Sequence, residues 1–419
     1  MTAEPDAPQT LLATLSGADR PGVTSHLFAS LEDLDVAVLD VEQVVVRGHL
    51  TLAVLLAAGP ASEAVAARVA KVAYDLDMTV TTALGTGDPG RNRTGRAAVV
   101  ALGQPLTASA VGAVTATVAA TGANIDRIRR LSRYPVTTIE FDISGADVTR
   151  LRHDLAQVSA TEGVDIAVSP SGLARRGRRL VVLDVDSTLI QDEVIELLAS
   201  HAGRADEVHA VTESAMRGEI DFTESLRQRV AVLAGLPESV IHEVTAQVRL
   251  TPGARTLVRT LHRLGFTVAL VSGGFTPIVE SIAHDLGIRH VRANDLEVVD
   301  GRLTGRVLGA VVDRAGKAAA LREFAEAESL PLSRTVAIGD GANDLDMLQS
   351  AGLGVAFNAK PVVRSQADTS VNVPYLDTVL FLLGISREEI EEADLLPLPE
   401  PPTRAEPADA DADEGHSPT

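Results

Sequence analysis

The chain has 419 residues, 45% of them hydrophobic, which is enough to build two or three domains that each bury a core. It contains no cysteine, so disulfides, thiolate metal sites and cysteine nucleophiles are excluded. The formal charge is −20 and there is no basic patch with interleaved aromatic residues, which argues against nucleic acid as a partner.

We expect a soluble cytoplasmic protein that binds no membrane, and an acidic C-terminal tail. The first residues, MTAEPDAPQT, lack the basic and apolar segments of a signal peptide, and no apolar run reaches membrane-spanning length. Residues 388–419 carry eleven acids and one arginine, and their Pro, Ala, Asp and Glu content cannot bury enough surface to fold. We therefore expect a disordered acidic tail at 394–419.

The first 170 residues contain an internal repeat. Gly17 and Gly59 are 42 residues apart at the ends of apolar runs, Gly103 and Gly145 have the same spacing, and the copies are offset by 86 residues. Each copy predicts the order strand, helix, strand, strand, helix, strand. In the first copy the predicted strands are 11–15, 36–46, 50–56 and 79–83, and the helices start near Pro21 and Glu63. The Gly-rich segment 85–95 would link the copies.

This βαββαβ order resembles the ACT domain, a ferredoxin-like module that often binds small amino acids at a dimer interface. The string GADRPG matches the first turn of that family, whereas the second copy departs from it with GQPLT. The resemblance implies ACT-like domains at 1–86 and 96–172, and a homodimer. It gives three candidate contacts for a regulatory ligand: Gly17, Asp19 and Gly103. A purely structural pair of ACT-like domains is the alternative.

The segment 178–393 predicts an open α/β sheet. The apolar run Leu180–Leu183 is typical of a strand buried on both faces of a parallel sheet, and Asp184 and Asp186 come directly after it, at the end where such sheets bind ligands. In a strand, residues i and i+2 point to the same side, so both carboxylates should face one place. They would repel each other without a cation or a proton. The alternative is a polar strand end without chemistry.

Polar residues come after three further predicted strands. Ser272 follows the predicted strand 268–271, and Gly339 and Asp340 follow the strand 335–338. Asn358 and Lys360 come after the strand 352–356. Residues 190–250 are predicted to be largely helical, and an insertion directly after the strand that precedes Asp184 would cover the site as a cap. A β-hairpin is predicted at 296–308.

Four motifs together resemble those of the haloacid dehalogenase-like phosphohydrolases. They are DVDST at 184–188, SGG at 272–274, Lys317, and GDGAND at 339–344. Each motif alone is weak, whereas all four in this order, at strand ends or helix starts, are specific. The resemblance implies a Rossmann-like parallel sheet with a helical cap, and a magnesium-dependent phosphohydrolase.

The resemblance also implies a role for each residue of these motifs. Asp184 would attack phosphorus, and Asp186 would protonate the leaving alkoxide and later activate water. Asp184, Asp340 and the main-chain carbonyl of Asp186 would hold Mg²⁺, a hard ion that prefers oxygen ligands. Lys317 would pair with the phosphate and the nucleophile; a solvated lysine at a helix start is the alternative.

Further contacts are expected around the phosphate. Ser272 and the Gly273 amide, near a helix start, would bind phosphate oxygens. Asn343 would contact the bound substrate and, together with Asp344, would organise Lys317 and the water around the metal. Asp344 could instead cap the helix after it.

A closer resemblance, to the phosphoserine phosphatase family, is carried by the strings DVDSTLIQDEVIELLA, AMRGEIDFTESLRQRV and GVAFNAKP. In that family a glutamate binds the substrate ammonium, and Glu193 matches its position. An arginine binds the substrate carboxylate, and Arg229 matches its position. Met216 and Phe222 match the apolar cap residues over the substrate. Arg227 would point elsewhere on the helix. Glu193 could instead stabilise a helix dipole.

The resemblance implies hydrolysis of O-phospho-L-serine to L-serine and phosphate through an aspartyl-phosphate, the last step of phosphorylated serine biosynthesis. L-Serine is then a possible allosteric inhibitor at the ACT-like domains, and deletion of residues 1–170 is expected to relieve that inhibition while keeping the active site. Three alternatives stay open: a phosphatase for another small phosphomonoester, a phosphotransferase, and a non-enzymatic amino-acid sensor.

Overall fold

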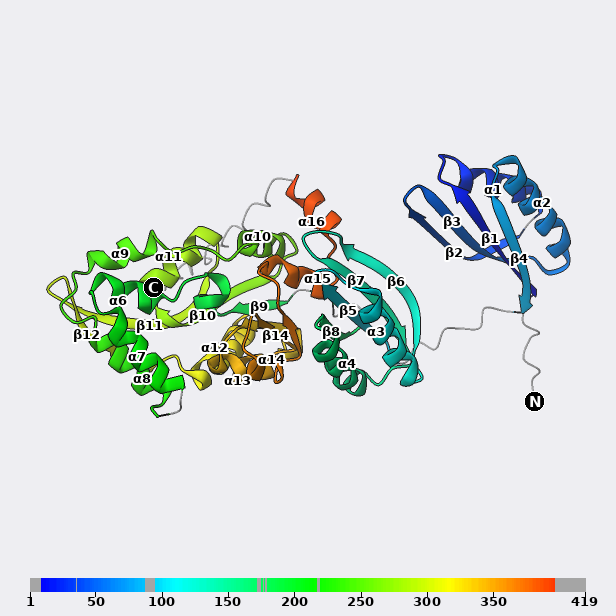
Figure 1. Ribbon diagram of the computed structural model, residues 1–419. Helices are drawn as coiled ribbons and strands as arrows, with labels where there is room; N and C mark the ends of the chain where they lie inside the picture. Colours follow the sequence, from blue (N-terminus) through cyan, green and yellow to red (C-terminus); the bar gives the residue numbers. More distant parts are fainter. Residues whose placement is uncertain are drawn as a thin grey trace, which may run out of the picture. The chain divides into compact units, whose positions relative to one another are not determined.

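A computed structural model of the chain describes residues 9–34, 36–86, 95–171, 175, 177, 179–216 and 219–395 (Figure 1). It divides the chain into two compact units, Met1–Asn92 and Arg93–Thr419. The predicted link between the repeats at 85–95 falls largely outside the described residues, as does the acidic tail beyond Leu395. Within the part of the chain that the structure describes, no helix is both long and apolar enough to cross a bilayer.

The first unit holds one βαββαβ domain, as predicted. Its elements are β1 (Gln9–Ala18), α1 (Val23–Leu31), a 3₁₀ turn (Glu32–Leu34), β2 (Ala37–Val46), β3 (His49–Ala57), a 3₁₀ turn (Gly59–Ala61), α2 (Ser62–Asp75) and β4 (Thr79–Thr86). The strands form an antiparallel sheet in the order β2-β3-β1-β4. Alternate residues of β1 and β3 are buried in one core with the apolar residues of α1 and α2, whereas β2 is exposed along its whole length. One face of this sheet is therefore covered by its own helices.

The second repeat has the same topology but is buried more completely. Its elements are β5 (Ala97–Gly103), α3 (Ala108–Ala120), β6 (Asn124–Ser132), β7 (Thr137–Ser144), α4 (Val148–Glu162) and β8 (Asp165–Pro170), with sheet order β6-β7-β5-β8. Every residue of β5 is buried. Val99 and Ala101 belong to a core shared with α3 and α4, whereas Val100 and Leu102 belong to the main core of the C-terminal domain. The second ACT-like domain thus packs its other sheet face on its neighbour.

The C-terminal domain, residues 179–395, is built on a seven-stranded sheet in the order β12-β11-β10-β9-β13-β14-β15. The strands are β9 (Leu180–Leu183), β10 (Thr267–Phe275), β11 (His290–Val299), β12 (Arg302–Leu308), β13 (Thr335–Gly339), β14 (Leu353–Phe357) and β15 (Thr369–Val371). Strand β9 is fully buried at the centre and runs parallel to both β10 and β13. The predicted hairpin is formed by β11 and β12, which are antiparallel. The carboxyl ends of β9, β10 and β13 consequently meet at one edge.

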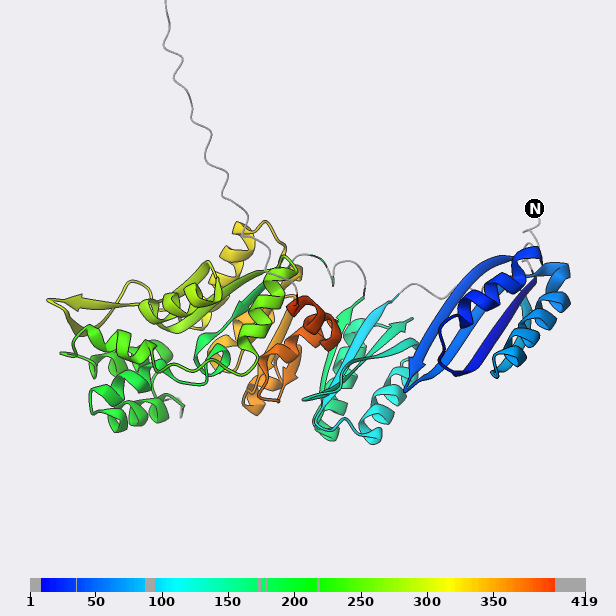
Figure 2. The same ribbon diagram turned by 90° about the horizontal axis from the view of Figure 1, so that it is seen from above.

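Helices cover both faces of this sheet, as Figures 1 and 2 show. They are α10 (Ala254–Arg263), α11 (Thr276–Leu286), α12 (Arg314–Ala327), α13 (Leu345–Ser350), α14 (Pro361–Arg364) and α15 (Val379–Leu382), with 3₁₀ turns at Leu332–Arg334, Ala342–Asp344 and Leu376–Thr378. The last helix, α16 (Arg387–Asp394), packs on α10 and on β6. The apolar residues of α10 and α11 belong to one core, and those of α12 and α13 belong to a second core. Because β9 contributes residues to both cores, it is a rigid support for the turn at its carboxyl end.

Four helices between β9 and α10 form the expected cap: α6 (Val194–His201), α7 (Ala205–Met216), α8 (Phe222–Ala231) and α9 (Ser239–Thr245). The chain enters and leaves the cap side by side, because Ile190 and Leu250 form an antiparallel bridge. Next to this bridge Asp192 accepts hydrogen bonds from the Arg249 main-chain N–H at 2.8 Å and from its guanidinium at 2.7 Å. The cap is therefore attached to the sheet through one paired neck.

The boundary predicted for the acidic tail needs a small correction. Asp394 is the last residue of α16, and its carboxylate pairs with Arg259 and Arg263 of α10 at 2.5 Å each. Two arginines on one face of a neighbouring helix hold this residue, which composition alone placed in the tail. Residues 396–419 lie outside the described residues.

Candidate active site

The sharp turn after β9 places the two aspartates of the DVDST motif. The main-chain N–H of Asp184 donates to the Ile338 carbonyl of β13 at 2.9 Å, so the strand pairing continues to this residue. The chain then leaves the sheet in a wide helical turn, Val185–Leu189, in which Ser187 adopts a left-handed conformation with φ of 55°. Asp186 thus lies in the turn and not in the strand. The two carboxylates face one cavity because of this turn, whereas the prediction relied on strand alternation.

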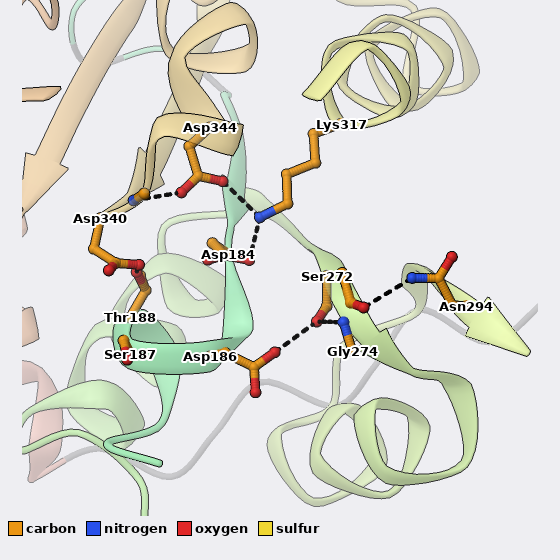
Figure 3. Close-up of polar contacts among 12 residues, drawn as sticks. Asp184, Asp186, Ser187, Thr188, Ser272, Gly274, Asn294, Lys317, Asp340 and Asp344 are labelled. Atoms are coloured by element: carbon orange, nitrogen blue, oxygen red, sulfur yellow. Dashed lines mark hydrogen bonds and ion pairs between the residues drawn. The ribbon is translucent and has the colours of Figure 1, made fainter. Parts of the chain in front are cut away.

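A buried lysine holds Asp184. The Nζ of Lys317, which is on the first turns of α12, donates to Asp184 Oδ1 and to Asp344 Oδ1 at 2.6 Å each (Figure 3). The Lys317 side chain is 0% exposed, so it is not the solvated lysine of the alternative interpretation. Burial would lower the pKa of Lys317, but Asp184 and Asp344 more than offset it, and the net pKa is raised. Asp344 also accepts from the Gly341 N–H at 2.9 Å, so both its oxygens are engaged.

Asp186 has a different set of partners. Its Oδ1 accepts from the Val194 N–H at 2.8 Å, at the start of α6, and its Oδ2 accepts from the Ser272 hydroxyl at 3.1 Å. The Ser272 oxygen in turn accepts from the Gly274 N–H at 2.7 Å, as Figure 3 shows. Burial is the main cause that raises the pKa of Asp186. A protonated Asp186 is thus more accessible at neutral pH than an ordinary aspartic acid would be.

Three carboxylates lie close enough together to hold a metal ion. Single carboxylate oxygens of Asp184, Asp340 and Asp344 lie within 4.8 Å of one another. Burial and the charge of Asp344 raise the pKa of Asp340 to about 6, and the same causes raise the pKa of Asp184 well above 3.8. Because Asp344 is already bound to Lys317 and Gly341, Asp184 and Asp340 are the carboxylates best placed for a metal. Crowded, buried oxygen ligands of this kind fit a hard divalent cation.

The cap completes a cavity of about 520 Å³ over this edge of the sheet. The sheet side of the cavity is lined by Asp184, Asp186, Gly273, Lys317, Asp340 and Asn343, and the cap side by Glu193, Thr212, Phe222 and Arg229. The site therefore brings five of the predicted phosphate and substrate contacts into one cavity: Gly273, Asn343, Glu193, Phe222 and Arg229. Ser272 lies behind the cavity wall, fully buried, and Arg227 is exposed on the outer face of α8. The side chain of Met216 lies outside the described residues.

The two predicted substrate clamps lie in the cap half of the cavity. Glu193 precedes α6 and accepts from the Ser187 hydroxyl at 2.8 Å. Burial, and next the charge of Asp186, raise the pKa of Glu193 to about 7. Burial lowers the pKa of Arg229, whose Nε donates to the Ser225 carbonyl at 3.4 Å. A carboxylate and a guanidinium that are both partly desolvated can recognise a ligand that carries the opposite pair of charges.

The predicted regulatory residues lie elsewhere. Asp19 lines a shallow groove with the N-terminal turn of α1. Gly17 is enclosed, because a Cβ added there would meet the Met78 side chain at 2.8 Å. Gly103 ends β5, where a Cβ would meet the backbone of Pro105 and Leu106 at 3.0 Å. Close packing alone thus explains why glycine occupies positions 17 and 103. A role of these glycines in ligand binding stays a prediction.

Sequence reasoning missed Asn294 and Val362, and it named Lys360 only as a polar residue after a predicted strand. Asn294 is 1% exposed; its amide donates to the Gly273 carbonyl at 2.8 Å and accepts from the Val312 N–H at 2.8 Å, which fixes the SGG loop. Lys360 and Val362 line the cavity from the segment after β14. The string GVAFNAKP marked that segment, but nothing in the sequence marked Asn294.

Comparisons with known proteins agree with the domain organisation described above. A model of haloacid dehalogenase-like hydrolases matches residues 181–349, and models of ACT domains match residues 9–83 and 96–169. The fold and the site thus define a haloacid dehalogenase-like hydrolase with two ACT domains before it.

The relatives define the family more narrowly. The chain is 58% identical to phosphoserine phosphatase of Streptomyces coelicolor and 52% identical to phosphoserine phosphatase SerB2 of Mycobacterium tuberculosis, covering in each case 92% of this chain and 95% of the relative. A solved structure of a probable phosphoserine phosphatase from Vibrio cholerae, in unliganded form, is 33% identical with a TM-score of 0.55, covering 72% of this chain and 90% of that chain. The chain belongs to the phosphoserine phosphatase family.

Proposed function

We propose that the protein hydrolyses O-phospho-L-serine to L-serine and inorganic phosphate through an aspartyl-phosphate, an acyl phosphate on the Asp184 carboxylate. One observation carries the proposal most strongly. Asp184, whose carboxylate is held by the buried Lys317, lines the same cavity as two charged groups of the cap. These groups are the carboxylate of Glu193 and the guanidinium of Arg229. This arrangement matches the phosphate, ammonium and carboxylate groups of one small amino-acid phosphoester.

The first half of the reaction uses Asp184 and Asp186. Lys317 holds Oδ1 of Asp184, which leaves the other oxygen free to attack phosphorus in line with the serine oxygen. As the new Asp184 O–P bond forms, the bond from phosphorus to the serine oxygen breaks. Asp186 donates its proton to that oxygen, and the raised pKa of Asp186 makes the protonated form available.

The second half releases phosphate. Asp186, now ionised, takes a proton from a water molecule, and the resulting hydroxide attacks phosphorus. The O–P bond to Asp184 breaks, which gives inorganic phosphate, restores the Asp184 carboxylate and leaves Asp186 protonated for the next cycle. Ser272 and the Val194 N–H hold Asp186 in place in both steps, so one residue can serve as acid and then as base.

We further propose that the metal is Mg²⁺, held by Asp184, Asp340 and the main-chain carbonyl of Asp186. When bound, the metal neutralises charge on the phosphate oxygens so that an anionic nucleophile can approach. The cluster supports this proposal because its carboxylates lie within 4.8 Å of one another, with Lys317 beside them. Thr188 donates to Asp340 at 3.2 Å and would orient that ligand.

The two ACT domains bear on regulation and assembly. The ACT domains suggest that L-serine binds the N-terminal half and lowers activity, and that the protein is a homodimer. A cytoplasmic location stays a prediction from the sequence. Because the second ACT domain shares a core with the C-terminal domain, a deletion that tests regulation should remove residues 1–94 and not 1–170. Inhibition that is lost in this truncated protein would support an allosteric serine site in the first ACT domain. Unchanged inhibition would indicate either a site in the second ACT domain or product competition, and only product competition would raise KM for phosphoserine without lowering kcat.

Phosphate release from a panel of phosphoesters tests the function. We expect kcat/KM for phosphoserine to exceed that for phosphothreonine by at least about tenfold, because the extra methyl group must fit the cavity. Sugar phosphates lack both the ammonium and the carboxylate, so they should be hydrolysed more slowly still. EDTA should abolish the activity and Mg²⁺ should restore it. If sugar phosphates were hydrolysed as well as phosphoserine, the assigned substrate would be wrong.

A further inference from the structure

The second ACT domain and the C-terminal domain meet through a buried carboxylate. Asp165, the first residue of β8, is 4% exposed and faces β15, the edge strand of the seven-stranded sheet. Its Oδ1 accepts from the Ser370 hydroxyl at 3.1 Å and from the Asn372 amide at 2.5 Å, and its Oδ2 accepts from the Asn372 main-chain N–H at 2.8 Å. Next to it, the Thr369 hydroxyl donates to the Ile166 carbonyl at 2.9 Å.

This carboxylate connects to the rim of the catalytic cavity. The side-chain oxygen of Asn372 accepts from the guanidinium of Arg364 at 3.1 Å, and Arg364 is the last residue of the short helix α14. Lys360, directly before α14, and Val362 and Val363 within it line the cavity that holds Asp184. Two steps, Asp165 to Asn372 and Asn372 to Arg364, thus lead from the ACT domain to the rim.

The strand pairing supports the same connection. The Asn358 N–H, at the end of β14, donates to the Val371 carbonyl of β15 at 2.8 Å. Asn358 adopts a left-handed conformation with φ of 46°, and only Ala359 separates it from Lys360. A shift of β15 would therefore move both ends of the short segment that forms the rim, since β15 holds Asn358 at one end and Asn372 holds Arg364 at the other.

We propose that Asp165 of the second ACT domain is a positioning residue for the active site, which acts through Asn372 and Arg364 on the rim segment 358–364. The second ACT domain is then a structural support of the substrate cavity, and it is not detachable from the catalytic domain. The inference rests on the proposed hydrolysis of phosphoserine, because that reaction supplies the readout.

KM and kcat for phosphoserine distinguish a residue that positions the active site from a residue that only stabilises the fold. Asp165→Ala in the full-length protein is expected to raise KM by about three- to tenfold, the range of typical coupling between distant groups, with kcat changed less than twofold. Arg364→Gln, on an exposed residue that should not affect folding, is expected to raise KM by a similar factor. Combining the two changes should raise KM no further than either alone, because both break one route.

Glu140→Gln is the matched control. Glu140 is a second buried carboxylate of the same ACT domain, 1% exposed, and it pairs with Arg129 and Arg175, which donate to the carbonyls of Gly384 and Leu382. This network crosses the same interface but ends away from the catalytic cavity. We expect this variant to have a lower Tm and an unchanged KM.

Three results would overturn the inference. They are a KM for Asp165→Ala or Arg364→Gln within twofold of the wild type, a rise in KM for Glu140→Gln equal to theirs, and effects that multiply in the double variant. If Asp165→Ala fails to fold, Arg364→Gln alone decides the outcome. A wild type that does not hydrolyse phosphoserine would refute the proposed function itself, which is a different outcome.

Discussion

Replacing Lys317 by methionine should destabilise the C-terminal domain, and more so at high pH than at low pH. The ammonium lies 2.6 Å from an oxygen of Asp184 and 2.6 Å from one of Asp344, and it is 0% exposed. Methionine has a similar volume but no charge, so the variant keeps two buried carboxylates without their cation. Removing one partner of a buried ion pair costs about 3–5 kcal/mol. For a domain of about 200 residues this corresponds to a fall in Tm of about 6–20 °C.

The pH dependence arises from the pKa of Asp184. Burial already raises that pKa above the unfolded value of 3.8, and the loss of Lys317 raises it further. A folded-state pKa above the unfolded value means that protonation stabilises the folded form, and this contribution is lost as the pH rises through the folded pKa. The deficit of Lys317→Met relative to the wild type should therefore be larger at pH 8 than at pH 5.5.

Thermal unfolding followed by circular dichroism, in EDTA so that no metal compensates, measures this effect. Lys71→Met is the control, because Lys71 pairs with Asp75 on an exposed helix surface at 2.5 Å and should change Tm by less than about 2 °C. The reasoning would be refuted by a Lys317→Met protein that melts within 2 °C of the wild type at pH 8. It would also be refuted by a deficit that does not shrink at pH 5.5.

Three further predictions concern the cap and the domain interface. Arg229→Lys should raise KM for phosphoserine about tenfold, because an ammonium cannot make a bidentate contact, while KM for phosphoethanolamine, which has no carboxylate, stays the same. Glu193→Gln should lower the ratio of kcat/KM for phosphoserine to kcat/KM for phosphoglycolate, because phosphoglycolate has no ammonium for Glu193 to bind. Competition assays of phosphate release measure this ratio. Burial alone would raise the pKa of Glu140, but the neighbouring arginines outweigh burial and lower it below 4.5. The Tm difference between the wild type and Glu140→Gln should therefore be largest above pH 4.5 and should shrink as the pH falls through the pKa of Glu140 in the folded protein. A Tm difference that does not depend on pH would contradict this.

The parts of the site that lie at strand ends could be predicted from the sequence. An apolar run with polar residues after it indicates a buried parallel strand and its ligand edge, and this pattern located Asp184, Ser272 and Asp340. Local structure corrected one detail. The sequence pattern treated Asp186 as part of the strand, whereas a wide helical turn with Ser187 in a left-handed conformation places its carboxylate.

The contacts between distant segments could not be predicted. Asp165 and Asn372 are far apart in the chain, and nothing in either segment alone indicates that they meet. One signal was available, however. The string AAVVALG of β5 is apolar at every position, whereas β1 of the first repeat alternates buried and exposed residues. Continuous apolarity indicates a strand covered on both faces, which is how the second ACT domain is buried.

The central claim is that Asp184 carries the phosphoryl group, and the most direct measurement is to trap that intermediate. The wild-type protein, mixed with phosphoserine labelled with ³²P in Mg²⁺ and quenched in acid, should retain label on the peptide that contains Asp184. Asp184→Asn should retain none and release no phosphate. Label on another residue, or phosphate release by Asp184→Asn at the wild-type rate, would contradict the account.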